Sequence, residues 1–431
     1  WCLVGSEMCI RDRPWREWLV ATLDADPAFA TLTEHMLAGD LLPEADAETR
    51  LATAFHRNTM TNDEGGTDDE EHRVAAVVDR VNTTMQVWMG FTASCAQCHD
   101  HKYDPMTQRE YFALFDVFNQ TADADRNDET PTIDVVSRSD PEADPVPVPV
   151  MEAVAEDERR ETRVQIRGNY RDLGELVQAG FPEAFHAGPS APSRLDLARW
   201  LCAPENPLTP RVQANRIWAR MFGRGLVETE EDFGRQGTVP THPELLDALA
   251  ARWLADEGRL RPFLKRLLMT DAWRRTSSAT PEALAVDPRN ERLARFPRVR
   301  LEPEVLRDQA LAVSDLLVRT KHGPPVYPPQ PDGVWRSPYN DARWTNSTGD
   351  DRFRRSVYTY WKRTAPHPTM TLFDAPSREV CTSRRLATNT PLQALVGLND
   401  PIFQEAALGF GRRIQGLSGD ERAQLAEGFR L

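Results

Sequence analysis

Cys95-Ala96-Gln97-Cys98-His99 is the most informative stretch of the chain, because it matches the pattern Cys-x-x-Cys-His that attaches c-type haem covalently. In that chemistry two thiols add to the porphyrin vinyl groups, and the adjacent imidazole becomes an axial ligand of the iron. On a helical turn, positions i, i+3 and i+4 share one face. We therefore expect Cys95, Cys98 and His99 to bind one haem c, with His99 as the proximal iron ligand.

Two other interpretations of this stretch remain open. Cys95, Cys98, His99 and His101 could bind a non-haem metal ion, but zinc usually takes its four ligands from two separated pairs, and no second Cys-x-x-Cys exists here. The cysteines could also form a disulfide or belong to a merely structural turn. Calcium is not excluded either, because residues 57–68 form a polar loop with several acids. The spacing of that loop does not match an EF-hand, and a solvated turn also explains it.

A haem used for electron transfer needs a sixth iron ligand, whereas an open position would suggest ligand binding or catalysis. Five side chains are candidates for this second axial ligand: His56, Met60, His72, Met106 and Met151. His101 lies only two residues from His99 and is badly placed to reach the opposite haem face.

Composition excludes several classes of protein. The formal charge of −14 argues against a nucleic-acid-binding surface over the whole molecule. A hydrophobic fraction of 40% is ample for real cores, and 431 residues favour two domains. No apolar run is long enough to cross a membrane.

The first thirteen residues, WCLVGSEMCIRDR, resemble a translated adapter or assembly scar and lack the order of a secretory signal. We expect residues 1–13 to be non-native and the chain to be a fragment cut at both ends. Without Cys2 and Cys9, four cysteines remain, which are too few for a disulfide framework.

Hydrophobic periodicity predicts a mainly α-helical protein with two helical domains. Residues 14–122 form the first domain around the Cys-x-x-Cys-His motif. Residues 123–190 form an acidic, proline-rich linker with a short β hairpin, in which Pro145–Pro149 is extended and residues 163–170 alternate and end in a turn. Residues 191–431 form the second domain, with long irregular loops and a truncated end. Capping boxes mark three helix starts, at Thr67–Glu70, Thr107–Glu110 and Thr390–Gln393.

The irregular stretch 323–351 is rich in aromatic residues: Tyr327, Trp335, Tyr339 and Trp344. Exposed rings could stack on sugar rings, so polysaccharide is a candidate partner, or they could pin a long loop to the body. Basic and aromatic residues interleave at 354–363, as in a strand that binds single-stranded nucleic acid. One short strand in an acidic chain is weak evidence, so we expect no nucleic-acid partner.

The sequence identifies no catalytic constellation, and whether the chain is an enzyme stays open. Charged residues near the end could form a buried ion network or a substrate pocket: Asp374, Arg378, Arg384, Arg385 and Asp400. A structural network is favoured, because removing one partner of a buried pair is costly whether or not the pair is functional. Arginines near Cys381 would favour its thiolate, but no histidine or other base has a recognisable spacing to it. A metal-dependent hydrolase using Asp374 therefore ranks last among the hypotheses.

Two sets of short motifs are distinctive in combination. The first half carries His56-Arg57-Asn58-Thr59, Glu64-Gly65-Gly66, Asp79-Arg80-Val81 and Cys95 through Pro105. The second half carries Asn206-Pro207-Leu208-Thr209, Asn215-Arg216-Ile217-Trp218, Asp232-Phe233-Gly234, His242 through Leu246, Arg307-Asp308, Phe373-Asp374-Ala375-Pro376 and Thr390-Pro391-Leu392-Gln393. In these motifs the chain resembles large secreted planctomycete proteins that pair a cytochrome c-like (PSCyt-type) domain with a planctomycete-specific companion domain, both of unknown function.

The resemblance covers nearly everything after Arg13. It implies a periplasmic or cell-surface location, haem attachment at Cys95, Cys98 and His99, and a first domain truncated at its start. The leading hypothesis is an exported c-type haem protein for electron transfer or redox sensing, with an unidentified redox partner. The alternative is a surface binding or scaffold protein, associated with polysaccharide, whose Cys-x-x-Cys-His motif is structural or holds a non-haem metal.

Overall fold

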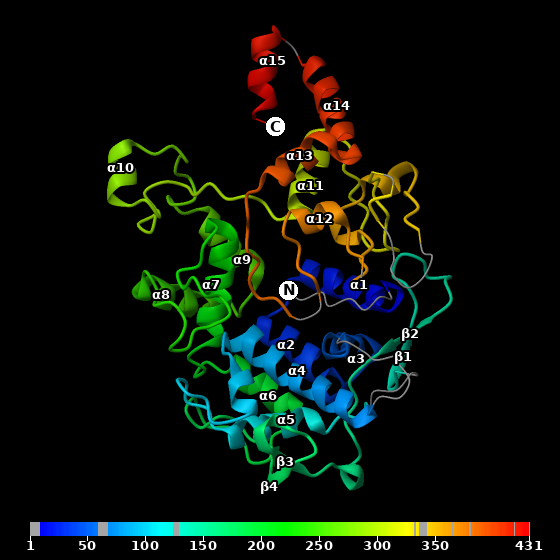
Figure 1. The fold of residues 1–431 in the computed structure, drawn as a ribbon, viewed down its shortest axis with the longest axis vertical. Coiled ribbons are helices and arrows are strands. Elements are labelled where there is room, and N and C mark those ends of the chain that lie inside the picture. Colours follow the sequence, from blue (N-terminus) through cyan, green and yellow to red (C-terminus); the bar gives the residue numbers. More distant parts are fainter. Residues whose placement is uncertain are drawn as a thin grey trace. The chain divides into compact units, whose positions relative to one another are not determined.

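The structure is a computed structural model that describes residues 9–58, 68–123, 129–331, 333–335, 343–363, 365–378, 381–417 and 419–430. The described residues form fifteen α-helices and two small antiparallel sheets (Figure 1). The predicted mainly α-helical class is therefore confirmed.

Contacts within the chain divide it into two compact units. We call residues 14–135 and 145–299 the motif unit, and residues 1–13, 136–144 and 300–431 the C-terminal unit. Each unit is described by itself below. The division predicted from the sequence, with a linker at residues 123–190, stays a prediction.

Several helices of the motif unit pack in pairs, and α4 and α5 contact the turn that carries Cys95. The helices that end within this unit are α1 (Cys9–Ala25), α2 (Phe29–Ala38), α3 (Ala47–Ala52), α4 (Asp69–Met89), α5 (Gln108–Asn119), α6 (Arg194–Cys202), α7 (Thr209–Phe222), α8 (Pro243–Ala255), α9 (Leu260–Leu268) and α10 (Pro281–Val286). The unit also contains short 3-10 turns, which lie between helices or between strands: η1 (Gly39–Leu41), η2 (Thr53–His56), η3 (Ala93–Gln97), η4 (Glu156–Glu158) and η5 (Ile166–Gly168). Helix α4 packs against α5, α2 against α6, and α7 against α8 (Figure 1).

Side-chain caps fix the helices on either side of the motif. The carboxylate of Asp68 accepts the Glu70 backbone N–H (3.1 Å) at the start of α4, and the predicted cap Thr67 lies outside the described residues. Helix α4 ends at Gly90, whose φ of +55° is left-handed and whose Cβ, if present, would lie 2.9 Å from a phenylalanine ring. The predicted capping box of α5 is confirmed, since Thr107 and Glu110 bond each other's backbone N–H groups.

The motif unit also contains two antiparallel two-stranded sheets. Strand β3 (Thr162–Gln165) pairs with β4 (Leu173–Val177), where the sequence indicates a short hairpin. Strand β2 (Val146–Pro149) is extended as its prolines require, and it pairs with β1 (Thr132–Val135), a partner that the sequence does not reveal.

Aromatic side chains dominate the buried parts of the motif unit. One chain of rings links Trp15 to Phe55 (6.1 Å between centroids) and Phe55 to Trp88 (5.8 Å). A separate cluster on α7, α8 and α9 is built from Trp218, Phe222, Leu246, Trp253, Phe263 and Leu267, among others. Large apolar area removed from water is the main stabilising contribution in such cores.

The C-terminal unit is built from short helices and long irregular segments. Its helices are α11 (Pro303–Val313), α12 (Pro368–Leu372), α13 (Pro391–Asn399), α14 (Pro401–Gln415) and α15 (Glu421–Gly428), with the 3-10 turns η6 (Gly349–Phe353) and η7 (Ser356–Tyr358). The predicted capping box at Thr390 and Gln393 is present. The strand considered for residues 354–363 is wrong, because these residues contain η7 and contribute only isolated bridges.

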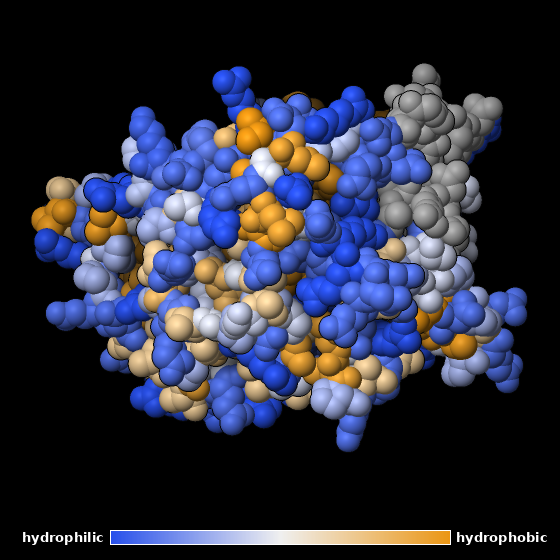
Figure 2. All heavy atoms as spheres, turned by 90° about the horizontal axis from the view of Figure 1, so that it is seen from below, coloured by the Kyte–Doolittle hydropathy of each residue, from blue (hydrophilic) through white to orange (hydrophobic). Residues whose placement is uncertain are grey.

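The surface is mainly polar. Figure 2 shows one face on which apolar residues form small, separate patches among hydrophilic side chains. None of the helices in the described part of the chain is long and apolar enough to span a membrane.

Candidate functional site

The Cys-x-x-Cys-His motif lies on the 3-10 turn η3 and the two residues that follow it. Ala93 and Ala96 are buried, and the turn packs against α4 and α5. Because a 3-10 turn has three residues per turn, Cys95 and Cys98 lie on the same side of it. Both thiols are exposed and free, and the His99 side chain is exposed beside them. The structure thus presents all three predicted site residues to solvent.

One ring nitrogen of His99 makes a hydrogen bond, and the other is available to bind a metal. Its Nδ1 lies 2.7 Å from the backbone carbonyl of Asp100, which can only accept a hydrogen bond. The proton is therefore on Nδ1, and Nε2 carries the lone pair that a metal would bind. A carbonyl that accepts the proton of the other ring nitrogen is a usual way in which a histidine ligand is oriented.

Side chains from α5 hold the turn in place. The carboxylate of Asp100 accepts the Gln108 backbone N–H (2.8 Å) at the start of α5. The Gln108 side chain donates to the carbonyl of Gln97 (2.9 Å) and to that of Gln165 (3.1 Å), which ties the motif to the end of β3. The turn η5, which follows β3, approaches the motif so closely that a Cβ on Gly168 would lie 3.0 Å from the Cys98 Sγ.

The residues at this turn carry the groups that covalent haem attachment requires. These groups are two accessible thiols and an exposed imidazole with a free Nε2. Both cysteines are free thiols, so no disulfide closes the motif. Within the described ranges, no three His, Cys, Asp or Glu side chains come together to hold a metal ion. His101 is buried instead, where its Nδ1 accepts the Asp104 backbone N–H (2.8 Å).

The candidates for a sixth iron ligand lie elsewhere in the motif unit. His56 is buried between Phe55 and Phe118, and its Nε2 lies 3.3 Å from the Thr84 hydroxyl. Burial, followed by the nearby guanidinium of Arg80, holds the pKa of His56 well below its usual value. Met106 and Met151 are also buried, His72 is half-buried on α4, and Met60 lies outside the described residues. No hydrogen bond or ring contact of the four described candidates reaches residues 95–99.

A buried ion cluster explains several of the family motifs. Arg80 is fully buried, and its guanidinium lies 2.5 Å from the carboxylate of Asp123 and donates to the backbone carbonyl of His56 (3.1 Å). Arg57 lies 3.9 Å from the same carboxylate and donates to the carbonyl of Val150 (2.8 Å). Burial alone would raise the pKa of Asp123, but the charges of Arg80 and Arg57 outweigh it and hold that pKa far below its usual range. The motif residues at 56–57 and 79–81 therefore contribute to scaffolding rather than to the haem turn.

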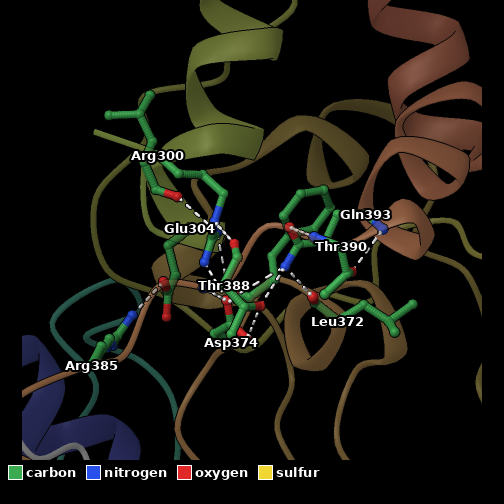
Figure 3. Close-up of polar contacts among 10 residues, drawn as sticks. Arg300, Glu304, Leu372, Asp374, Arg385, Thr388, Thr390 and Gln393 are labelled. Carbon is green, nitrogen blue, oxygen red and sulfur yellow. Dashed lines mark hydrogen bonds and ion pairs between the residues drawn. The ribbon is translucent and has the colours of Figure 1, made fainter. Parts of the chain in front are cut away.

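Asp374 and Arg385, two charged residues singled out in the C-terminal unit, each form an ion pair with a residue near the start of that unit's segment 300–431 (Figure 3). Asp374 has a left-handed φ of +66°, pairs with Arg300, and accepts hydrogen bonds from the backbone N–H (2.8 Å) and hydroxyl (2.9 Å) of Thr388. Arg385 pairs with Glu304 (2.7 Å). The two ion pairs join residues 74 and 81 positions apart, and the Thr388 bonds join residues 14 apart. Together they satisfy the carboxylate of Asp374, as expected of a structural network.

The remaining charged candidates are dispersed. Arg378 stacks over the ring of Trp361 at 4.4 Å, and Asp400 caps α14 and accepts a hydrogen bond from Thr369 (2.5 Å). Cys381 is disulfide-bonded, so the thiolate expected from its neighbouring arginines is wrong. A nucleophile at this position is thereby excluded.

Comparison with known proteins gives two family matches. Residues 193–431 match PSD1, described as a protein of unknown function (DUF1553), and residues 7–123 match PSCyt2, described as a protein of unknown function (DUF1549). No curated protein and no solved structure matches the chain. The two matched regions are the cytochrome-like domain and the companion domain that the motifs indicate.

Proposed function

The chain belongs to the PSD1 family and carries a PSCyt2 domain, both described as of unknown function. We propose that it is an exported c-type haem protein that transfers or senses electrons. In this proposal Cys95 and Cys98 form the thioether links, and His99 is the proximal ligand. The bound haem would supply one-electron redox chemistry.

One observation carries the proposal: two free, exposed thiols one 3-10 turn apart lie beside an exposed imidazole whose Nδ1 is already bonded to a carbonyl. A structural cysteine pair would be expected to be buried or cross-linked. A structural histidine would be expected to use both nitrogens, or to lie in the core as His56 does. The geometry supports a surface site where a cofactor can be added after the chain has folded.

The protein's own residues would orient the cofactor and tune it. The Asp100 carbonyl holds the proton on Nδ1 and would make Nε2 a stronger electron donor to a bound metal, which favours the oxidised form of that metal. The Gln108 side chain fixes the turn relative to α5 and β3. A cofactor edge at such an exposed turn would be accessible to a redox partner protein outside the cytoplasm.

The test is covalent haem content after export through a haem-attachment system. The unmodified chain should retain haem through denaturing electrophoresis and give the absorbance of a thioether-linked pyridine haemochrome. Replacing both Cys95 and Cys98 by serine should abolish that signal. The matched control is Cys202→Ser, which removes the third free cysteine, on α6 and outside the motif, and should leave haem content unchanged. Haem lost from the unmodified chain on denaturation would overturn the proposal.

A further inference from the structure

Four aromatic rings of the C-terminal unit form a half-exposed cluster that we call the aromatic platform: Tyr327, Trp335, Trp344 and Tyr360. The Trp344 ring lies at its centre, with centroids 5.1 Å from Tyr327, 5.7 Å from Trp335 and 6.1 Å from Tyr360. Tyr327 and Tyr360 are stacked at 4.8 Å. All four rings are only partly buried, unlike the core pair Trp218 and Phe222 of the motif unit.

The platform is held rigidly by the backbone. The indole N–H of Trp344 donates to the carbonyl of Pro328 (2.9 Å), and that of Trp335 donates to the carbonyl of Ala365 (2.6 Å). Backbone hydrogen bonds connect the segments that carry Tyr327 and Tyr360. The Val326 N–H donates to the carbonyl of Tyr358, and the Val326 carbonyl accepts the N–H of Tyr360. A ring face whose orientation is fixed before binding loses little conformational freedom when a ligand covers it.

Two buried polar side chains lack partners among the described residues, one in contact with the platform and one on the segment that carries Tyr327. His367 is 4% exposed, its ring lies 5.2 Å from Trp344, and neither ring nitrogen has a hydrogen-bond partner in the described part of the chain. Gln330 is 6% exposed and lies two residues from the Pro328 carbonyl that orients Trp344, and both atoms of its amide are also unpaired. Nearly all buried polar groups in folded proteins have partners. The two unpaired nitrogens of His367 beside the Trp344 ring, with the unpaired amide of Gln330 on the neighbouring segment, therefore indicate that a ligand completes the site.

We propose that the aromatic platform, together with His367 and Gln330, binds a neutral saccharide. A pyranose ring has an apolar C–H face that covers an aromatic ring, and hydroxyl groups at its edge that both donate and accept. A neutral imidazole and a primary amide also offer donors and acceptors together, which matches those hydroxyls. A purely apolar ligand would leave the four atoms unpaired.

The charge states of His367, Arg307 and Arg354 favour a neutral ligand over an anionic one. Burial, followed by the positive charge of Arg307, lowers the pKa of His367 to about 3, so this side chain is neutral at physiological pH. Arg307 donates to the carbonyls of Arg352 and Arg354, and Arg354 in turn donates to that of Pro324. Both guanidinium groups are thus occupied by backbone carbonyls.

The experiment uses the full chain on an array of neutral oligosaccharides that includes β-1,4-glucan, β-1,3-glucan, mannan and xylan, with calorimetry on the best hexasaccharide. The informative variants are His367→Phe and Gln330→Met, which keep side-chain size and remove the unpaired atoms. Each should weaken binding at least tenfold while leaving the melting temperature unchanged or higher, because an unsatisfied buried group destabilises the free protein. His242→Phe, at the exposed start of α8, is the control and should bind as the unmodified chain does.

Two results would overturn the proposal. One is an array on which no neutral saccharide binds. The other is unchanged affinity in both His367→Phe and Gln330→Met. The serine variant of Cys95 and Cys98 should bind saccharide normally, so failure of haem attachment and failure of this proposal are distinguishable.

Discussion

Replacing Arg80 by methionine should destabilise the motif unit by about 3–5 kcal/mol, the cost of leaving a buried charge without its partner. The Arg80 and Asp123 side chains are 1% and 8% exposed, and their closest contact is 2.5 Å. The substitution removes two hydrogen bonds to that carboxylate and one each to the Thr121 hydroxyl and the His56 carbonyl. Arg57, at 3.9 Å, is too distant to replace them.

The assay is urea unfolding followed by tryptophan fluorescence, with Arg109→Met as the matched control. Arg109 pairs with Glu175 at 3.4 Å, but both side chains are more than half exposed, so we expect its loss to cost no more than about 1 kcal/mol. The double variant Arg80→Met/Asp123→Leu should be destabilised by less than the sum of its single variants, since it removes both charges. A loss of under 1 kcal/mol for Arg80→Met alone would show that the cluster does not hold the fold as argued.

The same cluster gives a pH dependence of defined sign. The pKa of Asp123 is lowered in the folded protein, so the folded state favours the ionised carboxylate. The stabilisation is therefore complete above the unfolded pKa of about 3.9 and is lost progressively as the pH falls below it toward the folded value. Asp123→Asn should remove this part of the acid sensitivity as well as lower stability at pH 7.

Three further outcomes follow from the turn and its surroundings. Gly168→Ala should lower both melting temperature and haem occupancy, because φ is +74° and the new Cβ would lie 3.0 Å from the Cys98 Sγ; normal occupancy would contradict the close approach. Gly90→Ala should cost at least about 1 kcal/mol in urea unfolding for the same backbone reason. Burial raises the pKa of Cys202 to about 12, so iodoacetamide at pH 8 should label Cys95 and Cys98 well before Cys202, and equal labelling rates by mass spectrometry would refute this order.

Local features of this fold are predictable from sequence, because their causes lie within a few residues. The Thr107–Glu110 and Thr390–Gln393 capping boxes and the extended prolines of β2 all depend on neighbours in the chain. The pairing of β2 with β1 depends on a segment ten residues upstream with no distinctive pattern, and it could not be predicted. The basic–aromatic run at 354–363 alternates like a strand, but it pairs only at isolated bridges with Val318 and Val326, and the turn η7 interrupts it.

The candidate site divides in the same way. Cys95, Cys98 and His99 are identifiable because attachment chemistry requires fixed spacing, and all three are exposed while Ala93 and Ala96 of the same turn are buried. The sixth ligand is not identifiable, because whether His56 or Met151 can reach a metal depends on packing between distant segments. The aromatic stretch 323–351 is evident in the sequence, whereas the unpaired nitrogens of His367 beside Trp344 emerge only in the folded chain.

The contrast between His99 and Arg80 separates cofactor chemistry from scaffolding. The one hydrogen bond described for the His99 side chain goes to the carbonyl of the next residue, and the side chain is exposed, so His99→Ala should change the free energy of unfolding by no more than about 0.5 kcal/mol. Cys95 and Cys98 remain in that variant, so we expect haem to stay covalently attached while its absorbance and reduction potential change, since the axial ligand sets both. Arg80→Met should do the reverse: it lowers stability and haem yield together, and the haem that does attach keeps an unchanged spectrum. An unaltered spectrum and potential in His99→Ala would mean that this imidazole is not the iron ligand, even if the thioether links are present.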